Sequence, residues 1–120
     1  MLLPTGAELE ILRVLWAKGP SSVRDVHEIV GGGTSYTTTL KLLQMMHAKR
    51  LVTRDDAHRQ HIYEAAIDEQ RTLDSLVSRF VHNVFDGSAG ALALRALGDG
   101  SATRDELVQL KRLIRQLEKE

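Results

Sequence analysis

The chain has 120 residues, of which 42% are hydrophobic and 27% charged, and its 16 basic and 16 acidic side chains give a formal net charge of zero. It contains no cysteine, which excludes disulfides, thiolate metal sites and a thiol nucleophile. No hydrophobic run approaches the roughly 20 residues of a membrane helix, and the first residues lack the basic flank and apolar core of an export signal. We therefore expect a cytoplasmic protein.

The neutral total conceals a local excess of positive charge between residues 37 and 61. This stretch holds five Lys and Arg side chains against Asp55 and Asp56, a local charge of +3, and three histidines accompany them. Such a cluster is typical of a surface that binds nucleic acid, although the solvated face of an ordinary domain is an alternative. The cations are Lys41, Lys49, Arg50, Arg54 and Arg59.

Hydrophobic spacing predicts two helices in the first 30 residues. The first runs from about Ala7 to Ala17, and Gly19-Pro20 stops it. The second covers residues 23–30 and begins with a capping box, in which Ser22 and Asp25 satisfy free backbone amides. We expect its apolar side chains to face inward, namely Val23, Val26, Ile29 and Val30.

A third helix and a hairpin follow the three glycines at 31–33. Ser35 is a good N-cap for a helix from Tyr36 to about Lys49, and two short β-prone segments follow at 51–54 and 61–64. Three helices and a hairpin in this order predict a winged helix-turn-helix, whose third helix enters the DNA major groove. On that helix Tyr36, Leu40, Leu43 and Met46 form a packing stripe, whereas Thr37, Thr38, Lys41, Gln44 and Met45 form a free one.

The rest of the chain is predicted to be helical. A long helix starts near Asp68, a short one covers 88–97, and a last helix opens with a capping box of Thr103 and Glu106. The apolar stripe of the long helix is too wide for a helix lying alone on water, and the 3-4-3 spacing of apolar residues in the last helix is typical of a dimer interface. Both features favour a homodimer over the alternative, a three-helix bundle within one chain. The predicted dimer interface consists of Leu73, Leu76, Phe80, Val84, Leu107, Leu110, Ile114 and Leu117.

These elements define a mainly α fold with a small β-hairpin. We expect a winged helix-turn-helix DNA-binding domain at residues 1–67 and a C-terminal helical dimerisation domain at residues 68–120.

Several short sequence motifs occur in one order along the first 65 residues. They are PTGAELEIL at 4–12, Leu15-Trp16, Gly19-Pro20, VRDV at 23–26, YTTT at 36–39, Leu43-Gln44, Met46, Lys49, Leu51-Val52, Arg54, Arg59 and Tyr63. Together they resemble the penicillinase-repressor family of winged-helix transcriptional repressors. The resemblance implies a sequence-specific repressor that binds a palindromic operator as a homodimer and controls β-lactam-response or related genes.

The resemblance also implies which residues contact DNA. Family positions that touch DNA fall on the free face of the third helix, at Thr37, Thr38, Lys41 and Gln44, whose side chains can bond to bases or phosphates. Arg54 and Arg59 flank the hairpin and are placed for phosphate contact. Because Met45 stands where many relatives have Arg, and Arg50 where they usually have Gly, the operator sequence does not carry over from relatives.

A second implied partner is a membrane sensor metalloprotease, which inactivates some relatives by cutting an Asn-Phe bond in the short helix. The matching position here is near Arg95-Ala96, and neither residue matches. The copper-responsive branch of the family uses a cysteine cluster that is absent here.

The histidines and the other residues able to bind a metal or cofactor predict no site for either. His58 and His61 are the only close histidine pair, and spacing fixes no third ligand beside them. No nucleophile motif or phosphate-cradling glycine loop is present, so we do not expect an enzyme. A winged-helix interaction adaptor without DNA binding remains the alternative, because a fold does not determine a function.

Overall fold

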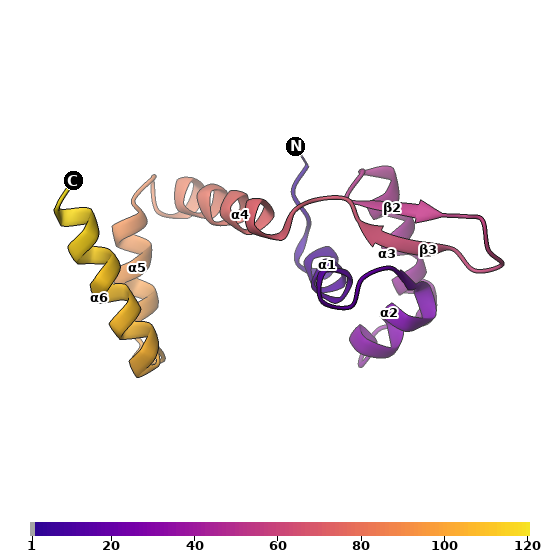
Figure 1. The fold of residues 1–120 in the computed structure, drawn as a ribbon, viewed down its shortest axis with the longest axis horizontal. Coiled ribbons are helices and arrows are strands. Elements are labelled where there is room, and N and C mark those ends of the chain that lie inside the picture. Colours follow the sequence, from indigo (N-terminus) through magenta and orange to yellow (C-terminus); the bar gives the residue numbers. More distant parts are fainter. Residues whose placement is uncertain (1) are drawn as a thin grey trace. The chain divides into compact units, whose positions relative to one another are not determined.

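The computed structural model describes residues 2–120, which form two compact units, one ending at Val77 and one spanning Ser78–Glu120 (Figure 1). The predicted functional division at residue 67 stays a prediction. The elements in chain order are α1 (Gly6–Lys18), β1 (Ser21–Ser22), α2 (Val23–Val30), α3 (Tyr36–Ala48), β2 (Val52–Asp55), β3 (Ile62–Ala65), α4 (Glu69–Val84), α5 (Ala89–Leu97) and α6 (Arg104–Glu118).

Side-chain caps set where the helices of the first unit begin. Ser22 and Asp25 form the predicted capping box of α2, and Ser35 accepts a hydrogen bond from the Thr38 amide at the start of α3. A further box, between Thr5 and Glu8, opens α1. The predicted bounds of α2 are confirmed, and those of α1 and α3 differ by one residue at the ends.

The sheet has three antiparallel strands in the order β1-β3-β2. The predicted hairpin is present with both strands shifted by one residue, and Arg54 lies opposite Tyr63. Strand β1 was not predicted, because two buried serines carry no β-propensity signal. They pair with Tyr63 and Ile62, so β3 is the central strand.

The core of the first unit lies between its three helices and the sheet. Two inward predictions are wrong: Ile29, near the end of α2, is 57% exposed, and Tyr36, whose ring borders an open groove at the start of α3, is 49% exposed. Trp16 is partly buried, and its indole Nε1 donates to the Ile67 carbonyl, which anchors α1 to the segment before α4. The buried hydrophobic side chains are Ile11, Leu12, Val14, Leu15, Val23, Val26, Leu43, Met46, Leu51, Val52 and Tyr63.

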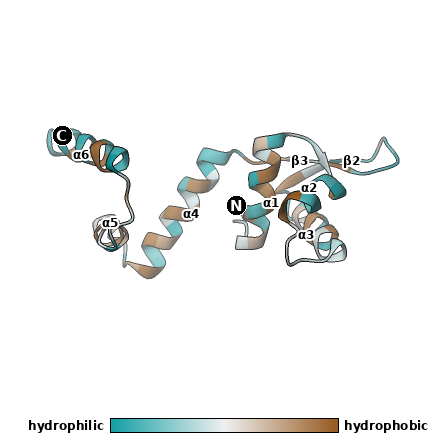
Figure 2. Ribbon diagram, turned by 90° about the horizontal axis from the view of Figure 1, so that it is seen from below, coloured by the Kyte–Doolittle hydropathy of each residue, from teal (hydrophilic) through white to brown (hydrophobic). Residues whose placement is uncertain are grey.

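The last three helices, of which α4 begins in the first unit, leave many of their apolar side chains exposed. No residue of α5 or α6 is buried, and along α4 only Thr72 is buried, near its start. Hydrophobic and hydrophilic residues alternate along α4 in Figure 2, as an amphipathic helix requires. Among residues 2–120, none of the helices combines the length and hydrophobicity needed to cross a membrane.

Candidate nucleic-acid interface

The outer face of α3 carries four exposed polar side chains, Thr37, Thr38, Lys41 and Gln44. The opposite face is anchored in the core by side chains that are almost fully buried: Thr39, Leu43 and Met46. The four residues predicted for base reading therefore lie together on one rigid helix. Their hydroxyl, ammonium and amide groups can pair with base edges in a major groove.

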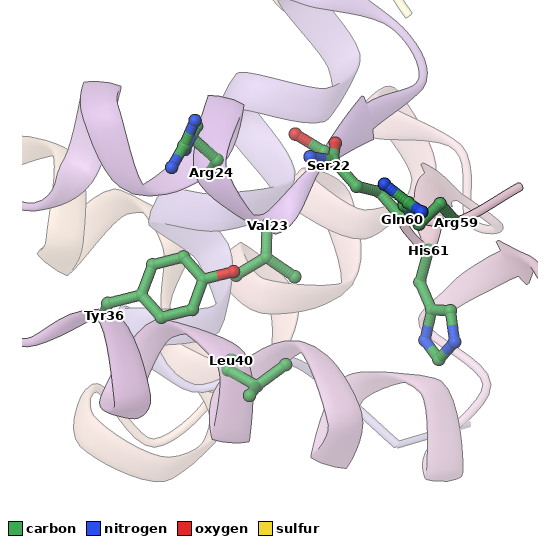
Figure 3. A pocket seen from close by; sticks show the side chains of 8 residues that line it. All are labelled: Ser22, Val23, Arg24, Tyr36, Leu40, Arg59, Gln60 and His61. Carbon is green, nitrogen blue, oxygen red and sulfur yellow. The ribbon is translucent and has the colours of Figure 1, made fainter.

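A groove of about 500 Å³ lies beside this face, between the first turn of α2, the start of α3 and the loop of the hairpin. Figure 3 shows its lining: Tyr36 and Leu40 come from α3, and Arg59, Gln60 and His61 from the hairpin. The other lining residues are Ser22, Val23 and Arg24. Two guanidinium groups thus border a groove that also contains an aromatic ring.

Two of the five predicted cations are neutralised within the first unit. Lys49 Nζ lies 2.8 Å from Glu8 Oε1 and 2.9 Å from Oε2, and Glu8 is only 1% exposed. Arg54 Nε lies 2.7 Å from Asp56 Oδ1. Of the local +3 charge, Lys41, Arg50 and Arg59 are the cations that make no ion pair within residues 2–120.

The pKa shifts agree with these pairings. The pKa of Arg54 is raised, first by the Tyr63 hydroxyl and then by the Asp56 carboxylate, whose Oδ1 lies 2.7 Å from Arg54 Nε. Burial acts to raise the pKa of Glu8, but the hydrogen bond from Lys49 and the Thr5 backbone amide outweigh it and leave this pKa below its usual value.

Arg24 and Tyr36 were missed as candidate binding residues. Arg24 occupies the first turn of α2, where the helix dipole favours acidic side chains, and its side chain lines the groove. Tyr36 was assigned to the packing face, although its ring is half exposed and lines the groove. Arg59 was predicted and lines the same groove, whereas Arg54 is not among its lining residues.

A capped helix pair followed by a two-stranded wing, with the polar face of the second helix exposed, defines a winged-helix DNA-binding regulator. The chain belongs to the penicillinase repressor family, whose sequence profile matches residues 4–116. The resemblance seen in the short motifs and the winged-helix fold class are both confirmed. No curated protein matches the sequence significantly.

Solved structures of other regulators share the fold. A MarR family protein from Bacillus stearothermophilus is 19% identical, with a TM-score of 0.53, over 97% of this chain and 74% of its own. YusO from Bacillus subtilis is 17% identical, with a TM-score of 0.55, over 96% of this chain and 74% of its own. A variant of MarR from E. coli, complexed with operator DNA, is 13% identical with a TM-score of 0.54 over 95% of this chain and 75% of its own.

Proposed function

We propose that this protein represses transcription by binding a palindromic operator as a homodimer in the cytoplasm. The observation that carries the proposal is the exposed polar face of α3 beside the groove that Arg24 and Arg59 border. Thr37, Thr38, Lys41 and Gln44 read base edges in the major groove, and the two arginines hold the phosphate backbone.

Arg54 has a smaller role in this proposal than the sequence predicts. Its guanidinium is already paired with Asp56, so contact with a phosphate requires exchange of that partner. Arg24, which makes no ion pair within residues 2–120, takes its place among the phosphate contacts.

The open apolar stripes of the second unit support the homodimer. Phe80, Val84 and Ile114 are between 48% and 57% exposed, and burying the open half of each would recover about 1 kcal/mol. We propose residues 68–120 as the dimerisation domain and residues 1–67 as the DNA-binding domain. The contacts are those predicted from the helical spacing: Leu73, Leu76, Phe80, Val84, Leu107, Leu110, Ile114 and Leu117.

The homodimer in turn supports a palindromic operator. Two copies related by a twofold axis present two α3 helices to half-sites about one helical turn apart.

The membership in a repressor family named for penicillinase supports β-lactam-response or related genes as targets. It also supports a membrane sensor metalloprotease as partner, with cleavage near Arg95-Ala96, which lies exposed on α5. Co-expression with such a sensor and inducer tests this part: release of DNA while the chain stays intact would refute proteolysis.

Selection of duplexes from a random-sequence library by the full chain tests DNA binding. We expect an inverted repeat, bound with an affinity that falls steeply as salt rises, because each neutralised phosphate releases a counterion. Lys41→Ala should weaken binding to the selected duplex by about 1 to 3 kcal/mol. Lys119→Ala, the same charge change at the end of α6, is the control and should have no effect.

Failure to select any duplex would refute the proposal and favour an interaction adaptor. An equal loss in the two lysine variants would remove Lys41 from the base contacts.

Introducing charge into the last helix tests the dimer. Leu110→Glu combined with Ile114→Glu should produce monomers in sedimentation, because four carboxylates would be buried across a twofold interface. Gln116→Glu, on an exposed position of the same helix, should leave the dimer intact. A double variant that still sediments as a dimer would refute the interface.

A further inference from the structure

The side chain of His27 joins the two helices of the helix-turn-helix. From α2, its Nδ1 lies 2.9 Å from Thr39 Oγ1 on α3, and Thr39 is only 1% exposed. Its ring also meets the Tyr36 ring edge to face, with centroids 5.7 Å apart and planes at 83°. One imidazole therefore contacts both the buried side and the groove side of the first turn of α3.

Thr39 has a second contact through the same hydroxyl. Its Oγ1 lies 3.5 Å from the Ser35 carbonyl oxygen and 2.9 Å from His27 Nδ1, and one proton lies between the hydroxyl and the ring nitrogen. The N-cap residue, the first turn of α3 and α2 are thereby linked through one buried hydroxyl.

The turn between the helices leaves room for this imidazole because residue 31 is glycine. A Cβ on Gly31 would lie 2.8 Å from His27 Cε1, 3.0 Å from Nδ1 and 2.4 Å from the His27 carbonyl oxygen. At Gly32 and Gly33, by contrast, a Cβ would meet nothing within 4 Å. Only the first of the three glycines is therefore required by a close approach.

We propose that His27 is a positioning residue that fixes the placement of the α3 reading face and so determines operator specificity. The inference rests on the proposed function. Thr37 and Thr38 lie between the two residues that His27 contacts, Tyr36 and Thr39. A shift of this turn changes their placement against base edges, whose recognition needs a fit within about half an ångström.

Loss of this link should reduce specificity more than overall affinity. Hydrogen bonds to base edges distinguish sequences, whereas contacts with phosphates do not. The phosphate contacts proposed for Arg24 and Arg59 come from α2 and from the hairpin, so binding to unrelated DNA should persist.

The test compares the affinity of the full chain for its selected duplex with that for a scrambled duplex of the same composition. Thr39→Val removes the hydroxyl and keeps the shape, and His27→Leu removes the ring nitrogen. Each should lower the affinity ratio by about tenfold, the value of one lost base contact, with unchanged binding to scrambled DNA. Thr39→Ser keeps the hydroxyl and His27→Asn keeps a polar group that can hydrogen-bond to it, so each of these variants should retain most of the wild-type affinity ratio.

The double variant His27→Leu with Thr39→Val should lose no more than the larger single loss, because both substitutions remove the same link. Thermal unfolding by circular dichroism shows which variants are folded. If Thr39→Val does not fold, the affinity ratios of His27→Leu and His27→Asn are compared instead. Substitution of His27 disturbs the core less, because His27 is only partly buried.

Unchanged ratios in folded variants, additive losses in the double variant, or parallel losses on both duplexes would overturn the positioning role. A wild-type chain that does not distinguish the two duplexes would instead refute the proposed function, and the inference would fall with it.

Discussion

Replacing Glu8 by glutamine removes one buried charge from the first unit and keeps the shape of the side chain. Glutamine still accepts the hydrogen bond that the Thr5 backbone amide gives to Glu8 Oε1, so the capping box of α1 survives. The substitution therefore isolates the ion pair with Lys49, which joins the start of α1 to the end of α3.

The expected loss follows from how each partner is buried. Breaking a buried ion pair costs about 3 to 5 kcal/mol when the remaining charge has no other partner. The Lys49 side chain is 27% exposed, so water can hydrate its freed ammonium, and we expect Glu8→Gln to cost about 1 to 2 kcal/mol. Lys49→Met leaves the carboxylate buried at 1% exposure, and should cost about 3 kcal/mol or more.

The difference between wild type and Glu8→Gln should also depend on pH. The pKa of Glu8 is lower in the folded chain than its ordinary value of 4.5. A carboxyl group with a lowered folded pKa contributes stability that is complete above its ordinary pKa and is lost as pH falls through the folded pKa. The difference should therefore be largest near neutral pH and shrink below pH 4.5.

Urea unfolding followed by circular dichroism at pH 7 and at lower pH measures these losses. Glu10→Gln, the same charge change at an exposed position of α1, is the control. A Glu8→Gln stability within about 0.5 kcal/mol of this control, the usual range of surface substitutions, would refute the reasoning. So would a difference that grows as the pH falls.

Three other substitutions test local features of the first unit. Arg50 has a φ of 66°, a conformation that costs an L-residue about 1 to 2 kcal/mol. Arg50→Gly should raise the urea midpoint, because the strain that it relieves exceeds the entropic cost of glycine, about 0.5 to 1 kcal/mol. A lower midpoint would contradict this. Gly31→Ala should lower the melting temperature well below that of Gly32→Ala, since its Cβ would lie 2.4 Å from a backbone carbonyl oxygen of α2; equal melting temperatures would show that the turn relaxes freely. Asp56→Asn releases the Arg54 guanidinium, and titrations at several salt concentrations should show a steeper salt dependence of DNA binding; an unchanged slope would place Arg54 away from the phosphates.

Sequence reasoning located the helices because their signals are local. The box of Ser22 and Asp25 and the cap at Ser35 involve residues three positions apart, and each begins a helix where it was predicted. The separation of Thr37, Thr38 and Lys41 from the core also follows from helical periodicity alone.

Features that depend on partners distant in the sequence could not be predicted in this way. Glu8 and Lys49 are 41 positions apart, so their pairing requires the packed fold. Strand β1 exists only because β3 lies beside it, and neither serine has a preference for strands. The exposure of Tyr36 has the same origin, because periodicity places it on the packing stripe but the groove between α2, α3 and the hairpin leaves half of its side chain open.

The ion pairs of Lys49 with Glu8 and of Arg54 with Asp56 reduce the number of cations that the basic stretch at residues 37–61 can offer to DNA. With Lys49 and Arg54 paired, each protomer offers two cations to phosphates beside the reading face, Arg24 and Arg59. At a slope of about 0.9 per phosphate, a dimer with about four contacts should lose about 150-fold in affinity between 50 and 200 mM salt, and a monomer about twelvefold. The salt dependence measured on the selected duplex therefore separates a dimer from a monomer independently of sedimentation. A loss of only about twelvefold in a chain that sediments as a dimer would mean that only one α3 contacts DNA.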